Sequence, residues 1–179
     1  MDAPRGDRGF TLVELILVSA IIGILATVIV PRVIQARMSS VEASTIGSLR
    51  ALNGAQAIFA SSCGSGRYAP SITWLATAPP GSTTKFIGPE FTTDPVKRLN
   101  YQFTLTAGTA DAKAPKTCNG LAAGLAASNY FLAADPYVVD PANAGRYFGT
   151  SSDGLIFQAT TKVRAFYSGP APAPAIPIQ

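Results

Sequence analysis

The stretch that decides the fold is residues 9–31, GFTLVELILVSAIIGILATVIVP. The 21 residues from Phe10 to Val30 are mostly apolar, and as an α-helix they would be about 31 Å long, close to the hydrocarbon thickness of a bilayer. Glu14 is the one charged residue among them. Placing its ionised carboxylate at the bilayer centre would cost roughly 2.5–3.5 kcal/mol of insertion free energy. The segment therefore predicts a membrane-spanning helix in which Glu14 lies near one interface.

The residues before this helix predict its orientation. Residues 1–9, MDAPRGDRG, are polar and carry Arg5 and Arg8. Basic residues beside a membrane helix favour the cytoplasmic side, so the part of the chain after the helix is expected to be exported. No small-x-small cleavage site follows the apolar run, which distinguishes it from an ordinary secretory signal.

The composition indicates one domain of ordinary size beyond the helix. The chain has 179 residues, of which 47% are apolar and 13% are charged. An average soluble protein has about 25% charged residues, so this surface is largely neutral and suits packing against copies of itself. The net charge of +4 comes from scattered cations, with no run longer than Lys97-Arg98, and does not favour nucleic acid as a partner.

The residue types limit the possible chemistry. There is no histidine, which excludes Ser-His-Asp, Cys-His and zinc-histidine sites, and nothing in the sequence calls for a cofactor. Cys63 and Cys118 are 55 positions apart and have no CxxC spacing, so a metal cluster or redox pair is not favoured. In an exported domain they would form one disulfide, worth about 4 kcal/mol in the chain-entropy model, and the alternative is two unrelated buried thiols.

The stretch RGFTLVELILVSAIIGILATVIVP resembles the N-terminal signature of type IV pilins and of the pseudopilins of type II secretion, and the resemblance extends over about residues 5–60. In that family a membrane peptidase cuts after the glycine, here Gly9, and the new N-terminal residue, here Phe10, is N-methylated. The resemblance also matches Glu14, four residues after Phe10, and Pro31, where the family commonly has a helix-kinking proline.

The resemblance implies a purpose for Glu14. After cleavage Phe10 carries a cationic amine, and in a bundle of such helices Glu14 of one subunit can pair with the Phe10 amine of its neighbour. A buried unpaired carboxylate is much more costly than a paired one, so this pairing would specify the axial register of the helices. The alternative is that Glu14 only extends toward the lipid headgroups.

After Pro31 the pattern becomes that of an amphipathic helix that ends near Ala60, with apolar or small residues at three- and four-residue steps: Ile34, Met38, Val41, Thr45, Leu49, Leu52 and Phe59.

A long connecting region follows, with a short helix expected at Ile72–Ala76. Alternation in NYQFTLTAG, further strand candidates at SNYFLAAD and GRYFGT, and a hairpin around Asp153-Gly154 predict an antiparallel sheet of three to five strands. The predicted fold class is α+β, with a long N-terminal helix packed on a small antiparallel sheet, as in the pilin head.

Two further features lie near the end of the sequence. Asp135, Asp140 and Asp153 raise the alternative of a calcium site, since some pseudopilins bind calcium in a C-terminal loop, although their spacing fits no EF-hand. Residues 170–179, with four prolines among them, are expected to form an extended, flexible surface tail.

The predicted organisation is a leader at residues 1–9, a membrane and filament-core helix at 10–31, a periplasmic globular domain at 32–169 and the tail. The resemblance implies a structural subunit, not an enzyme, that forms a helical homo-oligomer as a cell-surface pilus. Its expected partners are a prepilin peptidase, the inner-membrane assembly machinery, minor pilins and, before assembly, lipid. The alternatives are a pseudopilin of a short periplasmic pseudopilus and a membrane-anchored periplasmic binding module or enzyme.

Overall fold

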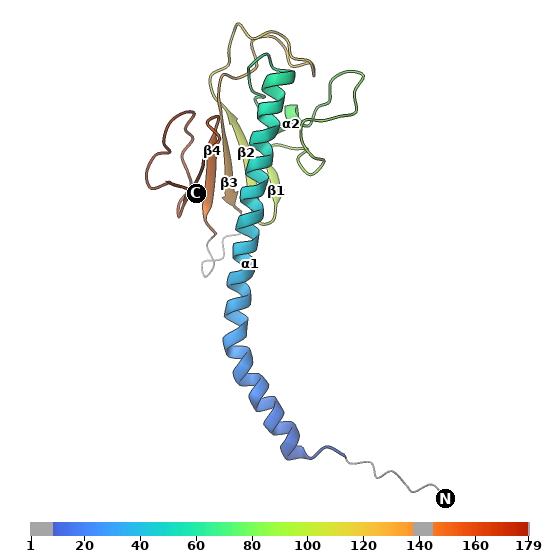
Figure 1. Ribbon diagram of the computed structural model, residues 1–179, viewed down its shortest axis with the longest axis vertical. Helices are drawn as coiled ribbons and strands as arrows, with labels where there is room; N and C mark the ends of the chain where they lie inside the picture. The colour runs from blue at the N-terminus through green and yellow to red at the C-terminus, as the bar shows by residue number, and fades with distance from the viewer. Residues whose placement is uncertain (1–8, 138–144, 179) are drawn as a thin grey trace, which may run out of the picture. The chain divides into compact units, whose positions relative to one another are not determined.

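A computed structural model describes residues 9–137 and 145–178 (Figure 1). The chain divides into two compact units, residues 1–39 and residues 40–179, and each is considered by itself. One helix, α1 (Leu12–Ser62), contributes to both.

In the first unit α1 begins with a side-chain cap. The backbone N–H of Glu14 donates to Oγ1 of Thr11 at 3.2 Å, and Thr11 to Glu14 has the Thr-x-x-Glu order of a capping box. The helix then continues through Pro31, whose ring nitrogen has no hydrogen to donate to the carbonyl one turn earlier. The long N-terminal helix predicted from the sequence is therefore confirmed.

In the second unit one face of α1 is buried. Its fully buried large side chains are Leu49, Leu52 and Phe59, and small or polar side chains fill the positions between them. The helix ends at Ser62, two residues beyond the predicted end, where Gly64 N–H donates to the Phe59 carbonyl at 2.7 Å. A Cβ on Gly64 would lie 2.1 Å from the Arg67 carbonyl oxygen, so only glycine fits this turn.

The sheet is an antiparallel meander in which each strand pairs with the next one along the chain. Its strands are β1 (Val96–Arg98), β2 (Tyr101–Ala107), β3 (Tyr130–Pro136), β4 (Tyr147–Ser151), β5 (Ile156–Ala159) and β6 (Ile176–Pro177). The α+β class is confirmed, but the prediction of three to five strands was too low, because the described chain forms six. The edge strands β1 and β6 have three and two residues, too few to show an alternating pattern.

The main core lies between α1 and one face of the sheet. Phe103, Leu132 and Phe148 from three adjacent strands are fully buried there against the apolar face of α1. Each such side chain contributes about 1.5–3 kcal/mol relative to exposure. This packing is what fixes the second half of α1 to the sheet.

A second, smaller core covers the opposite face of the sheet. Phe131 and Phe157 point there and pack against Val163 and Phe166 from the segment after β5. The same segment leads to β6, where Ile178 N–H donates to the Ile156 carbonyl at 2.8 Å. The sequence predicted an extended, flexible surface tail from residue 170 onward, and the structure adds this short strand at the sheet edge.

The connection between α1 and β1 contains α2 (Ile72–Leu75), the short helix expected from the sequence. Asp94 holds α2 to the sheet, because its carboxylate accepts hydrogen bonds from Ile72 N–H at 3.0 Å and Leu105 N–H at 3.4 Å. Burial raises the pKa of the Asp94 carboxyl, and these two backbone donors oppose that rise without cancelling it.

Candidate functional site

The predicted processing junction lies just before the first turn of α1. Gly9 and Phe10 are exposed and non-helical, and the Phe10 side chain is 81% exposed. A Cβ added to Gly9 would meet no atom within 4 Å, so the fold of this chain does not itself require glycine there. The peptide bond between them is accessible in backbone that a peptidase could bind in an extended form.

Glu14 lies one turn into the helix and is exposed. Its backbone N–H is satisfied by Thr11, whereas no cation of residues 9–137 and 145–178 lies within 4.0 Å of its carboxylate. The structure therefore adds a second function for this stretch, helix capping, that the sequence analysis did not assign. The pairing with a neighbouring Phe10 amine concerns a second copy and stays a prediction.

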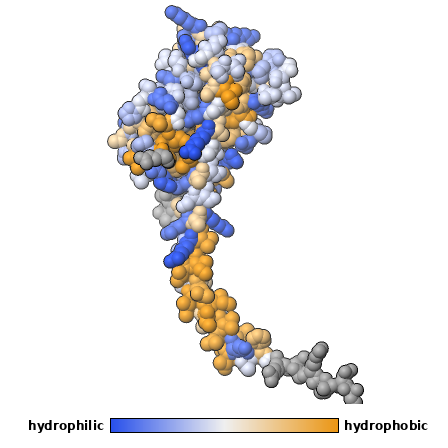
Figure 2. Space-filling view, in the orientation of Figure 1, coloured by the Kyte–Doolittle hydropathy of each residue, from blue (hydrophilic) through white to orange (hydrophobic). Residues whose placement is uncertain are grey.

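The first half of α1 presents an apolar surface on the face seen in Figure 2, and its large apolar side chains are exposed all round the helix. From Leu12 to Ile34 these residues are between 42% exposed, at Ile34, and 75% exposed, at Val13. The helix is long and apolar enough to cross a membrane, and none of its most apolar 18-residue window is buried by the chain itself. Such a surface is covered by lipid or by another apolar surface, since water would leave it unfavourably hydrated.

The hydroxyl groups on this surface are satisfied within the helix. Ser19 Oγ donates to the Leu15 carbonyl at 2.9 Å, and Thr27 Oγ1 donates to the Ile24 carbonyl at 2.7 Å. Back-bonding of this kind removes the cost of placing a hydroxyl in an apolar environment. Glu14 is then the one ionisable side chain between Phe10 and Val30.

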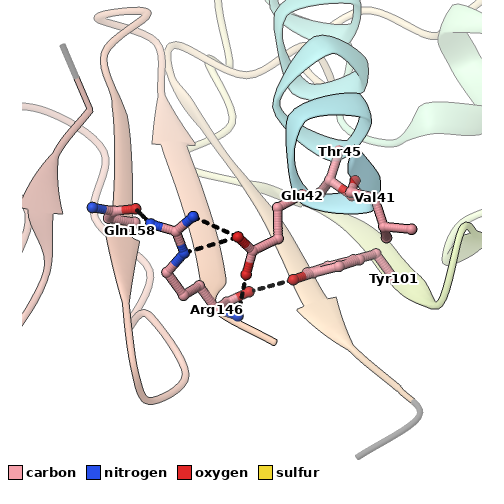
Figure 3. A network of polar contacts seen from close by, with 6 residues as sticks. All are labelled: Val41, Glu42, Thr45, Tyr101, Arg146 and Gln158. Atoms are coloured by element: carbon pink, nitrogen blue, oxygen red, sulfur yellow. Dashed lines mark hydrogen bonds and ion pairs between the residues drawn. The ribbon is translucent and has the colours of Figure 1, made fainter. Parts of the chain in front are cut away.

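In the second unit a polar cluster joins α1 to the sheet at Glu42, the first buried residue of the helix (Figure 3). Arg146 donates to the Glu42 carboxylate from its backbone N–H at 3.1 Å and from Nε at 3.0 Å. Its Nη1 donates to Gln158 on β5 at 2.6 Å, and its carbonyl accepts from the Tyr101 hydroxyl on β2 at 2.8 Å. One arginine thus connects α1 to β2 and β5.

Arg146 stabilises the ionised form of the Glu42 carboxyl group. Burial raises the pKa of the Glu42 carboxyl, but the hydrogen bonds and the charge of Arg146 together lower it by more, so the net pKa lies below the ordinary value of glutamate. Sequence analysis missed this pair because its members are 104 positions apart. The sequence signal that could have indicated a buried ion pair is the position of Glu42 on the apolar face of an amphipathic helix.

Cys63 and Cys118 form a disulfide, with their Cα atoms 4.9 Å apart. It links the residue after α1 to the segment between β2 and β3. The predicted disulfide is confirmed and the alternative of two unrelated thiols is wrong. Such bonds persist in oxidising compartments, which agrees with export of this part of the chain.

The structure does not bring together Asp135 and Asp153, two of the three residues that the sequence suggested as calcium ligands. Asp135, at the end of β3, pairs with Lys162 at 3.0 Å, and Asp153, in the turn after β4, accepts from Gly169 N–H at 2.8 Å. The register places Asp135 level with Tyr147, the first residue of β4, whereas Asp153 follows Ser151, its last residue, so the length of the strand, about 13 Å at 3.3 Å per residue, lies between them. Asp140 lies outside the described residues, and no group of three metal-binding side chains occurs among those described.

Comparison with known families gives a match that falls on the junction and helix just described. No curated protein and no solved structure matches the chain. Residues 4–30 match the family model of the prokaryotic N-terminal methylation motif. The chain therefore carries the leader motif of type IV pilins and pseudopilins, on residues that include Gly9, Phe10 and Glu14.

Proposed function

We propose that this protein is a structural subunit of a type IV pilus-like filament that polymerises through the first half of α1 after cleavage between Gly9 and Phe10. The observation that carries the proposal is the coincidence of two features in one segment. The methylation motif at residues 4–30 runs directly into a helix whose apolar side chains are exposed on all sides. A bundle of identical helices would bury that surface once the subunit leaves the lipid.

Cleavage would convert Phe10 into the N-terminal residue and create the amine that Glu14 needs as a partner. Glu14 of one subunit would pair with the Phe10 amine of the next, in a bundle where an unpaired carboxylate is strongly disfavoured. Helices stacked out of register would leave both charges unpaired. The single ionisable position in the apolar segment would in this way select one axial offset between subunits.

The topology and the partners follow from the same features. Arg5 and Arg8 favour a cytoplasmic leader, and the Cys63–Cys118 disulfide favours an oxidising periplasm for the second unit. The subunit would wait in the inner membrane with lipid around α1. A prepilin peptidase, the inner-membrane assembly machinery and minor pilins would then act on it.

The processing step can be tested in the native host with a matched pair of glycine variants. Gly9 and Gly23 both have open space around the position of a Cβ, so a larger side chain at either leaves the fold of the chain intact. We expect Gly9→Val to stop cleavage and filament formation, and Gly23→Val to be cleaved normally. The intact mass of the subunit extracted from membranes shows whether residues 1–9 have been removed. A Gly9→Val variant that is cleaved and assembled would refute the proposal.

Shearing of the native host that expresses the wild-type protein distinguishes a pilus subunit from a pseudopilus subunit and from a protein that uses the helix only as an anchor. Shearing releases surface pili into the medium, whereas a pseudopilus subunit stays with the cell envelope. A binding module that uses residues 10–30 only as an anchor would keep its leader and would not cross-link into helical oligomers. We expect sheared material that contains the subunit with methylated Phe10 at its N-terminus.

A further inference from the structure

The face of the sheet opposite α1 carries a row of polar and aromatic side chains across four strands. Lys97 on β1 is the register partner of Gln102 on β2, and Gln102 is the partner of Asp135 on β3. Because Ala134 on β3 pairs with Phe148 on β4, Tyr147 comes next in the same row. Side chains alternate between the faces of a strand, so these lie opposite the core residues Tyr101, Ala134 and Phe148.

A cavity of about 300 Å³ opens at this row. Its walls are Gln102, Asp135, Pro136, Tyr137, Tyr147 and Lys162. That volume is at the lower end of the range for small-molecule sites, and two tyrosines with a few polar groups are the usual lining of such sites. None of these side chains takes part in the proposed assembly through α1.

The charges around the cavity favour an acidic ligand. Asp135 Oδ2 is already paired with Lys162 Nζ at 3.0 Å, so that pair is close to neutral. Lys97 Nζ lies 5.3 Å from the centre of the Tyr137 ring, and no carboxylate of the described residues lies within 4.0 Å of it. The net local charge is therefore positive, and it lies beside an aromatic ring.

The polar groups favour a ligand rich in hydroxyls. Gln102 is half-buried and offers an amide donor and acceptor, and the 73% exposed Lys162 has ammonium hydrogens to donate besides the one directed at Asp135. Asp135 Oδ1 is covered from solvent and accepts no hydrogen bond in the described part of the chain. Of these polar groups, those that a ligand in the cavity can reach are therefore the Gln102 amide and the Lys162 ammonium.

We propose that this cavity binds a uronic acid unit of an acidic saccharide. The apolar face of the pyranose ring would pack on Tyr137 and Tyr147, its hydroxyls would bond to Gln102 and Lys162, and its carboxylate would pair with Lys97. The site belongs to the second unit alone. It stands whether or not the chain assembles into a filament.

The test measures binding of trigalacturonate to the full-length protein in detergent by equilibrium dialysis. Its fully methyl-esterified form is the matched neutral ligand, because it keeps the rings and loses the charge. We expect saturable binding with a dissociation constant on the order of 1 mM, typical of a small open site, and about fivefold weaker binding of the ester. Equal binding of the two ligands, or no saturation up to about 10 mM, would overturn the proposal.

Two exposed positions locate the binding without disturbing a core. Tyr137→Leu should abolish saturable binding, and Lys97→Gln should weaken trigalacturonate binding about fivefold while leaving the ester unaffected. Lys85→Gln removes an exposed lysine that does not line the cavity and should change nothing. Retained binding in Tyr137→Leu, or equal weakening by Lys85→Gln and Lys97→Gln, would show that the ligand binds elsewhere or responds only to net charge.

Discussion

Arg146 binds both oxygens of the Glu42 carboxylate, with its backbone N–H 3.1 Å from Oε1 and its guanidinium Nε 3.0 Å from Oε2. The carboxylate side chain is 11% exposed and the arginine side chain is 47% exposed, so the acid is the desolvated partner. The pair joins the first buried residue of α1 to the first residue before β4. Its consequences for stability can be measured directly.

Glu42→Gln should lower the free energy of unfolding of the second unit by about 1–3 kcal/mol, because the amide oxygen accepts fewer and weaker hydrogen bonds from Arg146. Denaturant titration of the full-length protein in detergent measures the change. Glu90→Gln is the control, since Glu90 is exposed and its nearest cation, on Arg98, is 4.0 Å away, and it should cost at most a few tenths of a kcal/mol. Equal effects of the two substitutions would mean that the Glu42 pair adds no stability of its own.

The contribution of Glu42 should also depend on pH. Its pKa is lower in the folded than in the unfolded protein, so the stabilisation is complete above the unfolded value of about 4.3 and is lost as pH falls through the folded pKa. The difference in unfolding free energy between wild type and Glu42→Gln should therefore be constant near neutral pH and shrink below about pH 4. A difference that grows with acidification would contradict the assigned direction of the pKa.

Glu14→Gln tests the pairing of charges in the proposed filament. Glutamine serves as well as glutamate in a Thr-x-x-Glu capping box, so the cap that Thr11 provides before α1 should be unaffected and only the charge is lost. We expect normal insertion and cleavage but fewer filaments, and the same for Glu14→Ala. The ratio of sheared filament to total membrane subunit, read by immunoblot, checks this.

If Glu14 only extends toward the headgroups, both variants should give wild-type amounts of filament. Thr11→Val separates the capping role, because it removes the cap hydroxyl and keeps the charge of Glu14. A filament defect in Thr11→Val equal to that in Glu14→Gln would show that assembly needs the helix cap and not the carboxylate. We expect the Thr11 variant to assemble.

Removal of the disulfide should destabilise the second unit. A Cys63→Ala, Cys118→Ala double variant should lose about 2–4 kcal/mol of unfolding free energy, since the cross-link restricts the unfolded chain. Wild type unfolded in the presence of a reductant should match the double variant. A reductant that leaves the wild-type unfolding curve unchanged would show that the bond does not form in the purified protein.

The features that the sequence determined by itself are local ones. The methylation motif, the apolar helix and the amphipathic stretch up to Phe59 are patterns within a few turns of one helix, and the alternation in Tyr101–Ala107 is a pattern within one strand. Period and hydrophobicity act between neighbours along the chain, so they can be read without the fold. The same holds for the turn at Asp153-Gly154, where Gly154 has a φ of +78°.

Only the tertiary structure decided which distant residues meet. Glu42 meets Arg146, and Lys97, Gln102, Asp135 and Tyr147 share one face, because the strand register and the packing of α1 place them there. The short edge strands and the separation of Asp135 from Asp153 depend on the same register. Register is set by burial of one whole face of the sheet against α1, an energy summed over many side chains that no short stretch of sequence contains.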